Sequence, residues 1–295
     1  MVKNLYRPPA GGWPAEAALP LRRMKKARID AVLAERGLFP SRTAAAGAVR
    51  AGAVRVGRDG PVALRPSQLI EPEVALIVAE GRRFVSRGGI KLENALDALG
   101  INVAGRDCLD VGASTGGFTD CMLQRGAARV IAADVAYGQI DVSLRNDPRV
   151  RVIERLNARE MLPADLPFVP GLATVDVSFI ALAKILPAVA GCLEPGGEVL
   201  AMVKPQFELG RARVGRGVVH DLSDRREAIL GVALTARELG LPIRGFASSG
   251  LPGPKGNRET FVWCGGDGAE VDDLEAAIAA AEPQERKAKG RGQRR

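Results

Sequence analysis

Short apolar runs alternate with helical patterns along the chain from about residue 88 onwards. Seven runs have the length of strands: Cys108–Val111, Val130–Asp134, Val150–Glu154, Leu172–Val177, Glu198–Val203, Ile243–Ala247 and Thr260–Cys264. Helical patterns lie between several of them, including a long one over about 222–239, and an alanine-rich helix is expected around 271–281. Because such alternation is typical of a parallel, doubly wound sheet, we predict an α/β fold with its ligand at the carboxyl edge of the strands.

A smaller module precedes this region. Ile29, Val32 and Leu33 share one helical face, and Ser41 is placed to cap a second helix over 42–50. Val54 and Val56 flank Arg55 as in a strand, Asp59-Gly60 is typical of a hairpin turn, and a further strand is expected over 74–78. A core this small leaves its arginines outside, so a phosphate-binding set is predicted from Arg28, Ser41, Arg42, Arg50 and Arg55.

Charge is distributed unevenly along the 295 residues. The net charge is +8, yet residues 1–60 hold 12 Lys or Arg against 4 Asp or Glu, and the last twelve residues hold 6 against 1. The stretch between them is mildly acidic, with 24 basic and 29 acidic residues. Two basic ends suggest a polyanion partner, although they could also be solvated tails. Residues 1–23 carry no periodicity and are expected to be a disordered extension.

Composition argues against several classes of protein. Four scattered cysteines without C-x-x-C spacing and a single histidine, His220, argue against disulfide frameworks and metal centres. No apolar run approaches the roughly 18 residues of a membrane span, and the opening segment lacks the apolar stretch of a secretory signal. We therefore expect a cytoplasmic protein without bound metal. His220 could serve catalysis or RNA contact, or merely end a loop.

The first strand of the α/β region runs into a glycine-rich turn, LDVGASTGGFTD at 109–120. A strand followed by such a turn and a helix is the usual place for a nucleotide ligand. Asp134, which ends the next strand, is placed to accept hydrogen bonds from a ribose, and Asp110 could face the amino-acid portion of a ligand. The spacing is not G-x-G-x-x-G, which favours S-adenosylmethionine over NAD. The turn alone leaves both, and an empty turn, open.

Four charged residues come from four separate segments at strand or helix ends. Asp176 lies near the end of the fourth strand and Lys204 ends the fifth. Glu259 opens the last strand, which would start at the same edge if it is antiparallel, and Lys91 begins the helix after Gly88-Gly89. These side chains could converge beside the ligand. The alternative is two unrelated surface ion pairs.

These motifs resemble known families. The helix–turn–helix and basic strand over about 26–80, RIDAVLAERG–SRTAAAGAVRAGAVRV, resemble the S4 RNA-binding domain rather than an unrelated small α+β module. The Lys-Asp-Lys-Glu tetrad beside the glycine turn is similar to FtsJ-type RNA 2′-O-methyltransferases, and with the S4-like module the chain resembles the TlyA (haemolysin A) family. The resemblance spans about 26–265 and rests on SRGGIKL (86–92), DVGASTGGFTD (110–120), ADVAYGQ (133–139), ERLNAR (154–159), DVSFI (176–180), VKPQFE (203–208), GVVHD (217–221) and PGPKGNRE (252–259).

The resemblance implies methyl transfer from S-adenosylmethionine to the ribose 2′-hydroxyl of cytidines in 16S or 23S ribosomal RNA, with ribosomal subunits as partners. Its tetrad maps onto Lys91, Asp176, Lys204 and Glu259. Its cofactor turn maps onto Asp110, Gly112, Ser114, Thr115, Gly116, Phe118 and Asp134, and we add Asn157 as a candidate adenine contact. Lys204 would be the proton acceptor or, if it stays charged, the group that orients the hydroxyl.

The implied fold is a Rossmann-like class I methyltransferase with a seven-stranded, mostly parallel sheet, preceded by a small α+β S4-like domain. We expect the S4-like domain over 24–81, a linker over 82–87, the FtsJ-type domain over 88–268, and a C-terminal helix with a basic tail over 269–295. The rival hypothesis is a non-catalytic ribosome-binding or assembly factor, against which the intact tetrad argues. A membrane-active haemolysin and a nucleotide-dependent oxidoreductase fit the sequence less well.

Overall fold

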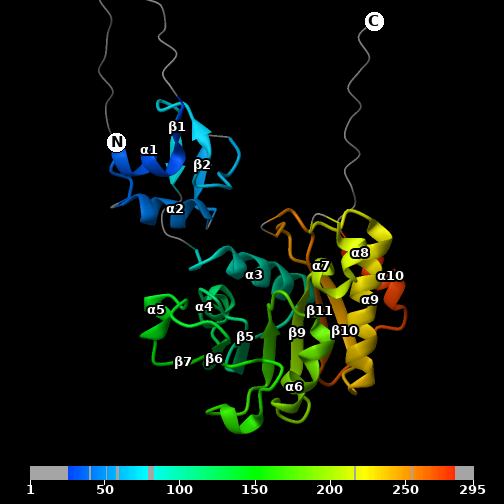
Figure 1. Ribbon diagram of the computed structural model, residues 1–295. Coiled ribbons are helices and arrows are strands. Elements are labelled where there is room, and N and C mark those ends of the chain that lie inside the picture. Colours follow the sequence, from blue (N-terminus) through cyan, green and yellow to red (C-terminus); the bar gives the residue numbers. More distant parts are fainter. Residues whose placement is uncertain are drawn as a thin grey trace, which may run out of the picture. The chain divides into compact units, whose positions relative to one another are not determined.

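The computed structural model describes residues 26–39, 41–50, 52–57, 60–78, 83–215, 217–253 and 255–282. The described residues form two compact units, a smaller one from those within 26–49 and 54–78 and a larger one from those within 50–53 and 83–282. The expected extension over 1–23, Asp59 of the expected hairpin turn and the basic tail lie outside the described residues. Figure 1 shows the elements of each unit.

The smaller unit contains both predicted helices, α1 (Ile29–Glu35) and α2 (Arg42–Arg50). The Ser41 hydroxyl accepts a hydrogen bond from Ala44 N at 3.1 Å, so it caps α2 as its position predicts. β2 (Val54–Val56) pairs antiparallel with β4 (Leu76–Val78). A second antiparallel pair, β1 (Ala27–Arg28) with β3 (Leu69–Ile70), was not predicted, because two-residue strands carry no alternating pattern.

The larger unit is built on a seven-stranded sheet in the order β10-β11-β9-β8-β5-β6-β7. Its strands are β5 (Asp107–Val111), β6 (Arg129–Asp134), β7 (Val150–Glu154), β8 (Leu172–Val175), β9 (Glu198–Val203), β10 (Ile243–Ser248) and β11 (Thr260–Gly265). The five strands from β5 to β9 run parallel, whereas β11 is antiparallel to both of its neighbours. The predicted α/β fold with a seven-stranded, mostly parallel sheet is confirmed, and the antiparallel β11 meets the condition under which Glu259 starts at the carboxyl edge.

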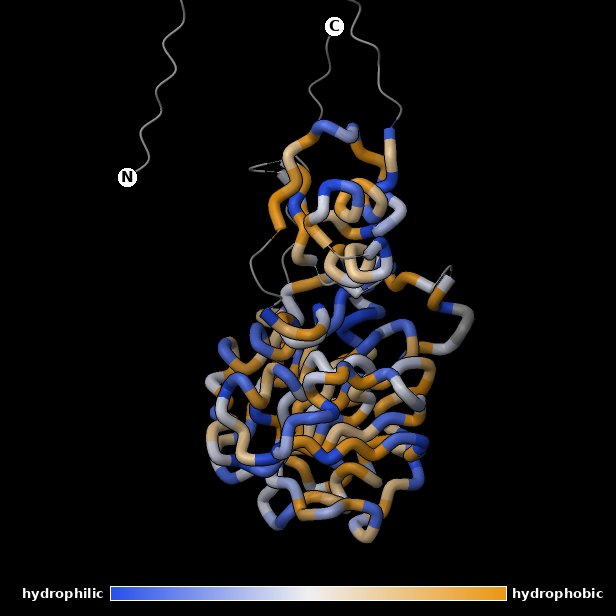
Figure 2. Tube along the Cα trace, turned by 90° about the vertical axis from the view of Figure 1, so that its left-hand side faces the viewer, coloured by the Kyte–Doolittle hydropathy of each residue, from blue (hydrophilic) through white to orange (hydrophobic). Residues whose placement is uncertain are grey.

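Helices cover both faces of this sheet (Figure 1). Within β9, Val199, Ala201 and Val203 belong to one apolar core, and Leu200 and Met202 belong to the other. α3 (Arg87–Leu99), α4 (Gly117–Gln124) and α5 (Val142–Arg145) contribute to the second core. α6 (Leu186–Gly191), α9 (Leu222–Glu238) and α10 (Leu274–Ala281) contribute to the first, and α7 (Pro205–Glu208) and α8 (Arg211–Val214) precede α9. Figure 2 shows hydrophobic segments through the interior of this unit, as expected for strands buried on both faces.

The described part of the expected linker over 82–87 is packed against the larger unit. Phe84 is buried in the core with α3 and α4, and Val85 N donates to Asp120 Oδ2 at 2.7 Å. Helix α3 already begins at Arg87, with Ser86 as its N-cap. Gly89 makes room for this packing, because a side chain there would collide with the Phe84 ring. The sequence 82–87 contains only two apolar residues, Phe84 and Val85, among basic and polar ones, and no periodicity in it predicts this docking.

The end of α10 is fixed to the start of α9 by a buried ion pair. Arg225 Nε lies 3.1 Å from Glu282 Oε2, and Arg225 Nη1 donates to the His220 carbonyl at 2.7 Å. The four cysteines are buried free thiols, and no group of potential ligands that could hold a metal ion occurs among the described residues. Across these same ranges, no helix combines the length and apolar character needed to cross a membrane.

Candidate functional site

The carboxyl edge of the sheet brings the four predicted charged residues together. Thr260 of β11 lies opposite Val203 of β9 in an antiparallel pair. Glu259, which precedes Thr260, and Lys204, which follows Val203, therefore lie at the same edge of the sheet. Asp176 follows β8 directly, and β8 is the neighbour of β9. Lys91 reaches the same place from the second turn of α3. The sheet register therefore assembles residues that are as much as 168 positions apart in the chain.

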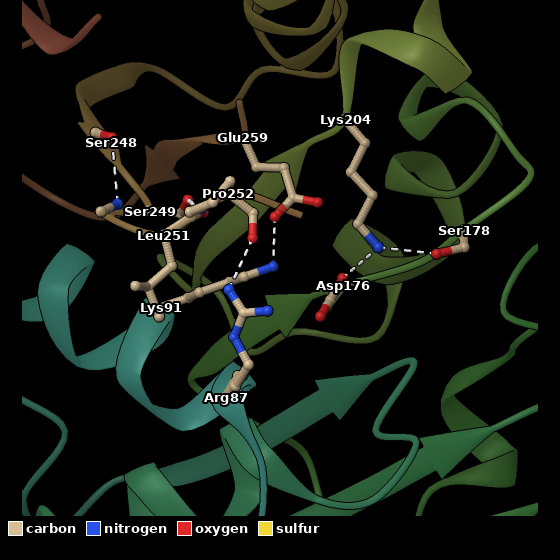
Figure 3. Close-up of polar contacts among 12 residues, drawn as sticks. Arg87, Lys91, Asp176, Ser178, Lys204, Ser248, Ser249, Leu251, Pro252 and Glu259 are labelled. Atoms are coloured by element: carbon tan, nitrogen blue, oxygen red, sulfur yellow. Dashed lines mark hydrogen bonds and ion pairs between the residues drawn. The ribbon is translucent and has the colours of Figure 1, made fainter. Parts of the chain in front are cut away.

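The four side chains form two ion pairs that face each other (Figure 3). Lys91 Nζ pairs with Glu259 Oε2, and Lys204 Nζ lies 2.5 Å from Asp176 Oδ1. Lys204 Nζ also donates to Ser178 Oγ at 2.9 Å. Lys91 and Lys204 are only 8% exposed and Glu259 only 2%, which rules out the alternative of two unrelated surface ion pairs. Burial of this kind requires each charge to keep its partner.

The loop that joins β10 to β11 encloses Glu259. Ser249 N donates to the Glu259 carbonyl at 3.0 Å, and Gly253 lies so close that a side chain there would come within 2.5 Å of Glu259 Oε1. The buried Asn257 joins this loop to the GVVHD segment, because its Oδ1 accepts from Val219 N at 2.9 Å and its Nδ2 donates to the Gly217 carbonyl at 2.8 Å. His220 itself is exposed on that segment.

A cavity of about 520 Å³ opens beside Asp176, at the ends of β5, β6, β7 and β8. Four of the eight residues predicted to hold a cofactor line it: Gly112, Ser114, Asp134 and Asn157. The lining also includes Ala136, Gln139, Met161 and the segment from Asp176 to Ile180. The cavity therefore adjoins the tetrad at Asp176. At the glycine turn its wall carries the polar side chains of Ser114 and Asp134.

The glycine turn is held by specific backbone contacts. Gly112 has φ +83°, and a side chain there would lie 2.6 Å from the Asp176 carbonyl oxygen. Ser114 has φ +50°, and its N–H donates to Asp134 Oδ2 at 2.7 Å. The other Asp134 oxygen accepts from Ala136 N at 2.7 Å. Asp134 thus shapes the turn and the cavity wall together, and each of its oxygens retains a lone pair for a ligand.

The other four predicted cofactor residues, Asp110, Thr115, Gly116 and Phe118, do not line this cavity. Phe118 is buried and packs against Phe261, with ring centroids 5.8 Å apart. Asp110 is fully buried, and its Oδ2 accepts from Thr119 N at 2.9 Å and Thr119 Oγ1 at 2.7 Å. Strand periodicity does not reveal which end-of-strand carboxylate is covered by a helix.

Burial raises the pKa of Asp110 from 3.8 to about 7. The folded chain therefore keeps this proton up to about pH 7, whereas the unfolded chain releases it near pH 4, and the stability from this group is lost as the pH rises between those values. We expect Asp110→Asn to make the free energy of unfolding less dependent on pH between 5 and 8. Urea denaturation at a series of pH values measures this, with Asp107→Asn as the control on the same strand. An unchanged pH profile in Asp110→Asn would contradict the assignment.

Two residues beside the tetrad were not singled out from the sequence. Ser178 contacts Lys204, and Phe179 is 90% exposed at the cavity mouth, with φ +67° and its ring on Phe207 at a centroid distance of 5.1 Å. A D-x-S spacing at a strand end was the available signal for Ser178. Nothing in the local pattern distinguishes Phe179 from a core residue, because exposure of an aromatic side chain depends on the loop conformation.

The predicted phosphate-binding arginines are exposed. Arg28, Arg42 and Arg55 belong to the smaller unit, and Arg50 ends α2 at its boundary. The buried Asp30 is 2.7 Å from Arg28 Nη2 and 3.5 Å from Arg42 Nη2, so it fixes both guanidinium groups on one side. Their outer edges remain accessible to a polyanion.

Comparison with known proteins adds family information to this geometry. Residues 84–266 match the model of the FtsJ-like methyltransferase family. The chain is 50% identical over 242 residues to a Mycobacterium tuberculosis protein named 16S/23S rRNA (cytidine-2′-O)-methyltransferase TlyA, covering 81% of this chain and 90% of that protein. It is 41% identical over 256 residues to a Bacillus subtilis protein provisionally named an rRNA methyltransferase, covering 85% and 90%.

The fold is also similar to that of a solved structure. A Streptococcus thermophilus protein provisionally called a hemolysin superimposes with a TM-score of 0.67 at 39% identity, over 88% of this chain and 96% of that chain. The region matched by the family model contains all four tetrad residues and every residue that lines the cavity.

Proposed function

Because the chain belongs to the TlyA family of FtsJ-like methyltransferases, we propose that it transfers a methyl group from S-adenosylmethionine to the 2′-hydroxyl of a cytidine in ribosomal RNA. The observation that carries this proposal is the pair of buried ion pairs, Lys91–Glu259 and Lys204–Asp176, at the mouth of a cavity that includes Asp176 in its wall. We place the reaction in the cytoplasm, with ribosomal subunits as the partner.

The cavity presents groups that suit the proposed cofactor. The missing side chain at Gly112 leaves the turn open beside the Asp176 backbone. The Asp134 carboxylate is positioned to accept from ribose hydroxyls, Asn157 can bond an adenine edge, and Asp176 brings a negative charge toward a cationic ligand. When bound, S-adenosylmethionine supplies a methyl group that is already activated by a positively charged sulfur.

Lys204 is the residue that we assign to the ribose oxygen. An ammonium group has three N–H donors, of which one is directed to Ser178 Oγ, and the charge of Lys204 is paired with Asp176 Oδ1. A further N–H can donate to the 2′-oxygen, orient it, and stabilise the negative charge that develops as its proton leaves. Asp176, the tetrad carboxylate that lines the cavity and pairs with Lys204, receives that proton. The Lys91–Glu259 pair holds the opposite side of the site in place.

The exposed ring of Phe179 lies where a target nucleotide would enter. RNA-modifying proteins commonly hold unpaired bases by stacking them on aromatic side chains. Phe179 presents such a ring at the mouth of the cavity, and Phe207 supports it from beneath. We therefore propose that the target is an unpaired nucleotide rather than one inside a duplex.

The smaller unit is proposed to dock on rRNA as an S4-like domain. We expect Arg42→Ala and Arg55→Ala each to weaken binding to ribosomal subunits, because each removes a cation that can contact a phosphate. The slope of log affinity against log salt should fall by about 0.7–0.9 per lost contact. Filter binding across a salt series measures this, while cofactor affinity should not change. Arg149→Ala, which removes an arginine paired with Asp147 in the larger unit, is the matched control. Equal slopes in all variants would contradict the docking role.

The experiment that tests the proposed activity is methyl transfer in vitro. Purified protein is incubated with methyl-labelled S-adenosylmethionine and separated small and large ribosomal subunits, and the RNA is digested to nucleosides. We expect the label in 2′-O-methylcytidine. Binding to subunits without incorporation of label would instead support the rival, non-catalytic assembly factor.

A further inference from the structure

The segments that follow β8 and β9 are joined by more than the Lys204–Asp176 pair. The Phe179 and Phe207 rings pack together. Beyond them, the Glu208 carboxylate accepts from Leu182 N with both oxygens, at 3.0 and 3.2 Å. Glu208 ends α7, which starts immediately after Lys204, and Leu182 begins the short helix η2 (Leu182–Lys184). The two segments are therefore tied at both ends.

A wall of the proposed cofactor cavity lies between the Lys204–Asp176 contact and the Glu208–Leu182 contact. Residues from Asp176 to Ile180 line the cavity, and Ile185 lines it just beyond η2. Within this wall, Phe179 has a positive φ, a conformation that residues with a side chain keep only when their surroundings hold it. The hydrogen bond from Leu182 N to Glu208 holds the segment on the C-terminal side of Phe179. Without this bond, the cavity-lining segment would be held only on its N-terminal side.

Glu208 has the environment of a group that holds a backbone. It is partly buried, and burial raises its pKa to about 7, while the Leu182 N–H opposes that shift. Both of its carboxylate oxygens accept from a backbone N–H, that of Leu182. A carboxyl group taken out of water depends on the hydrogen bonds it accepts. The bond to Leu182 N is thus the main compensation for burying this side chain.

We propose that Glu208 is a positioning residue, which fixes the 176–182 segment against the segment that carries Lys204. In this role it sets the cavity wall and Phe179 relative to the tetrad without touching the reacting atoms. The inference rests on the proposed function, because the cavity is taken to hold the cofactor. A hydrogen-bond acceptor at position 208 is what this role requires, whether or not it is charged.

The test compares Glu208→Ala with Glu208→Gln in the full chain. We measure cofactor affinity by calorimetry with S-adenosylmethionine, and kcat and KM for ribosomal subunits in the methyl-transfer assay. Glu208→Ala should lower cofactor affinity and kcat by about tenfold each, the size expected for one hydrogen bond to a charged group, and change KM for subunits less, because the smaller unit is proposed to supply the docking contacts. Glu208→Gln should restore most of both, because its amide oxygen can accept from Leu182 N. Glu238→Ala, at the exposed end of α9, is the matched control.

The outcomes separate the two proposals. Wild-type cofactor affinity and kcat in Glu208→Ala, or equal impairment in Glu208→Gln, would overturn the positioning role while the wild-type enzyme still transfers methyl groups. A general loss of folding would lower every parameter together and is checked by circular dichroism. If Glu208→Ala does not fold, Glu208→Met replaces it, because Met fills a similar volume without a strong acceptor. A wild-type protein that transfers no methyl group would overturn the proposed function instead.

Discussion

Lys204→Ala is expected to reduce methyl transfer by about 10³-fold or more while cofactor affinity stays near the wild-type value. Lys204 has two polar partners within the site, Asp176 and Ser178, and it directly follows β9 at the carboxyl edge of the sheet. Removing it takes away the donor for the ribose oxygen and leaves Asp176 without its cation. It does not line the cavity, so cofactor binding should survive. Single-turnover transfer and calorimetry measure the two effects separately.

The matched control for this prediction is Lys184→Ala. Lys184 is an exposed lysine of η2, and its loss should leave both transfer and cofactor binding unchanged. Turnover that survives in Lys204→Ala would remove Lys204 from the mechanism. A parallel loss of cofactor affinity would show that the variant damages the site more widely than the loss of one donor.

Gly112→Ala is expected to disrupt the cofactor cavity at the glycine turn. Gly112 has φ +83°, and an added Cβ would meet the Asp176 carbonyl oxygen at 2.6 Å and its carbon at 3.0 Å. A backbone atom cannot rotate away as a side chain can, so either the glycine turn or the Asp176 segment must shift. Displacement of a catalytic segment by about 1 Å can cost about 100-fold in rate. We expect a loss of that size in methyl transfer, with weaker cofactor binding as well.

Gly105→Ala separates this collision from backbone strain. Gly105 has a similar φ of +74°, yet a side chain there would meet nothing within 4 Å. Both variants should lose about 1–2 kcal/mol of stability from the left-handed conformation, whereas only Gly112→Ala should lose cofactor affinity and transfer. Thermal unfolding and calorimetry on both variants make the comparison. Equal cofactor affinity in the two would contradict the close approach at Gly112.

Much of the fold was predictable because its signals are local. Seven strands were expected within about two residues of their observed ends, since strands buried on both faces are near-continuous apolar runs bounded by turn residues. The tetrad was predictable for a related reason. Once the strands and the reversed last strand are known, the residues at their ends must meet at one edge, and Lys204 and Glu259 do so through the Val203–Thr260 register.

What escaped prediction depends on depth and on loop conformation. Asp110 and Asp134 both lie on strands beside the glycine turn, yet Asp110 is sealed beneath α4 and only Asp134 reaches the cavity. Phe179 is exposed because of its unusual backbone angle, and Phe84 is buried because Gly89 leaves space for it. None of these features follows from hydrophobic periodicity. They arise from packing between segments that are distant in sequence.

The central claim is that this chain methylates ribose in rRNA, and mapping 2′-O-methyl groups in cells tests it most directly. Ribosomal RNA is isolated from cells with the gene, without it, and complemented with either the wild-type or the Lys204→Ala form. Primer extension at low nucleotide concentration then locates the modified positions. We predict that stops at one or more cytidines disappear without the gene, return with the wild-type form and do not return with Lys204→Ala. An identical pattern of stops in all four strains would contradict the proposed activity.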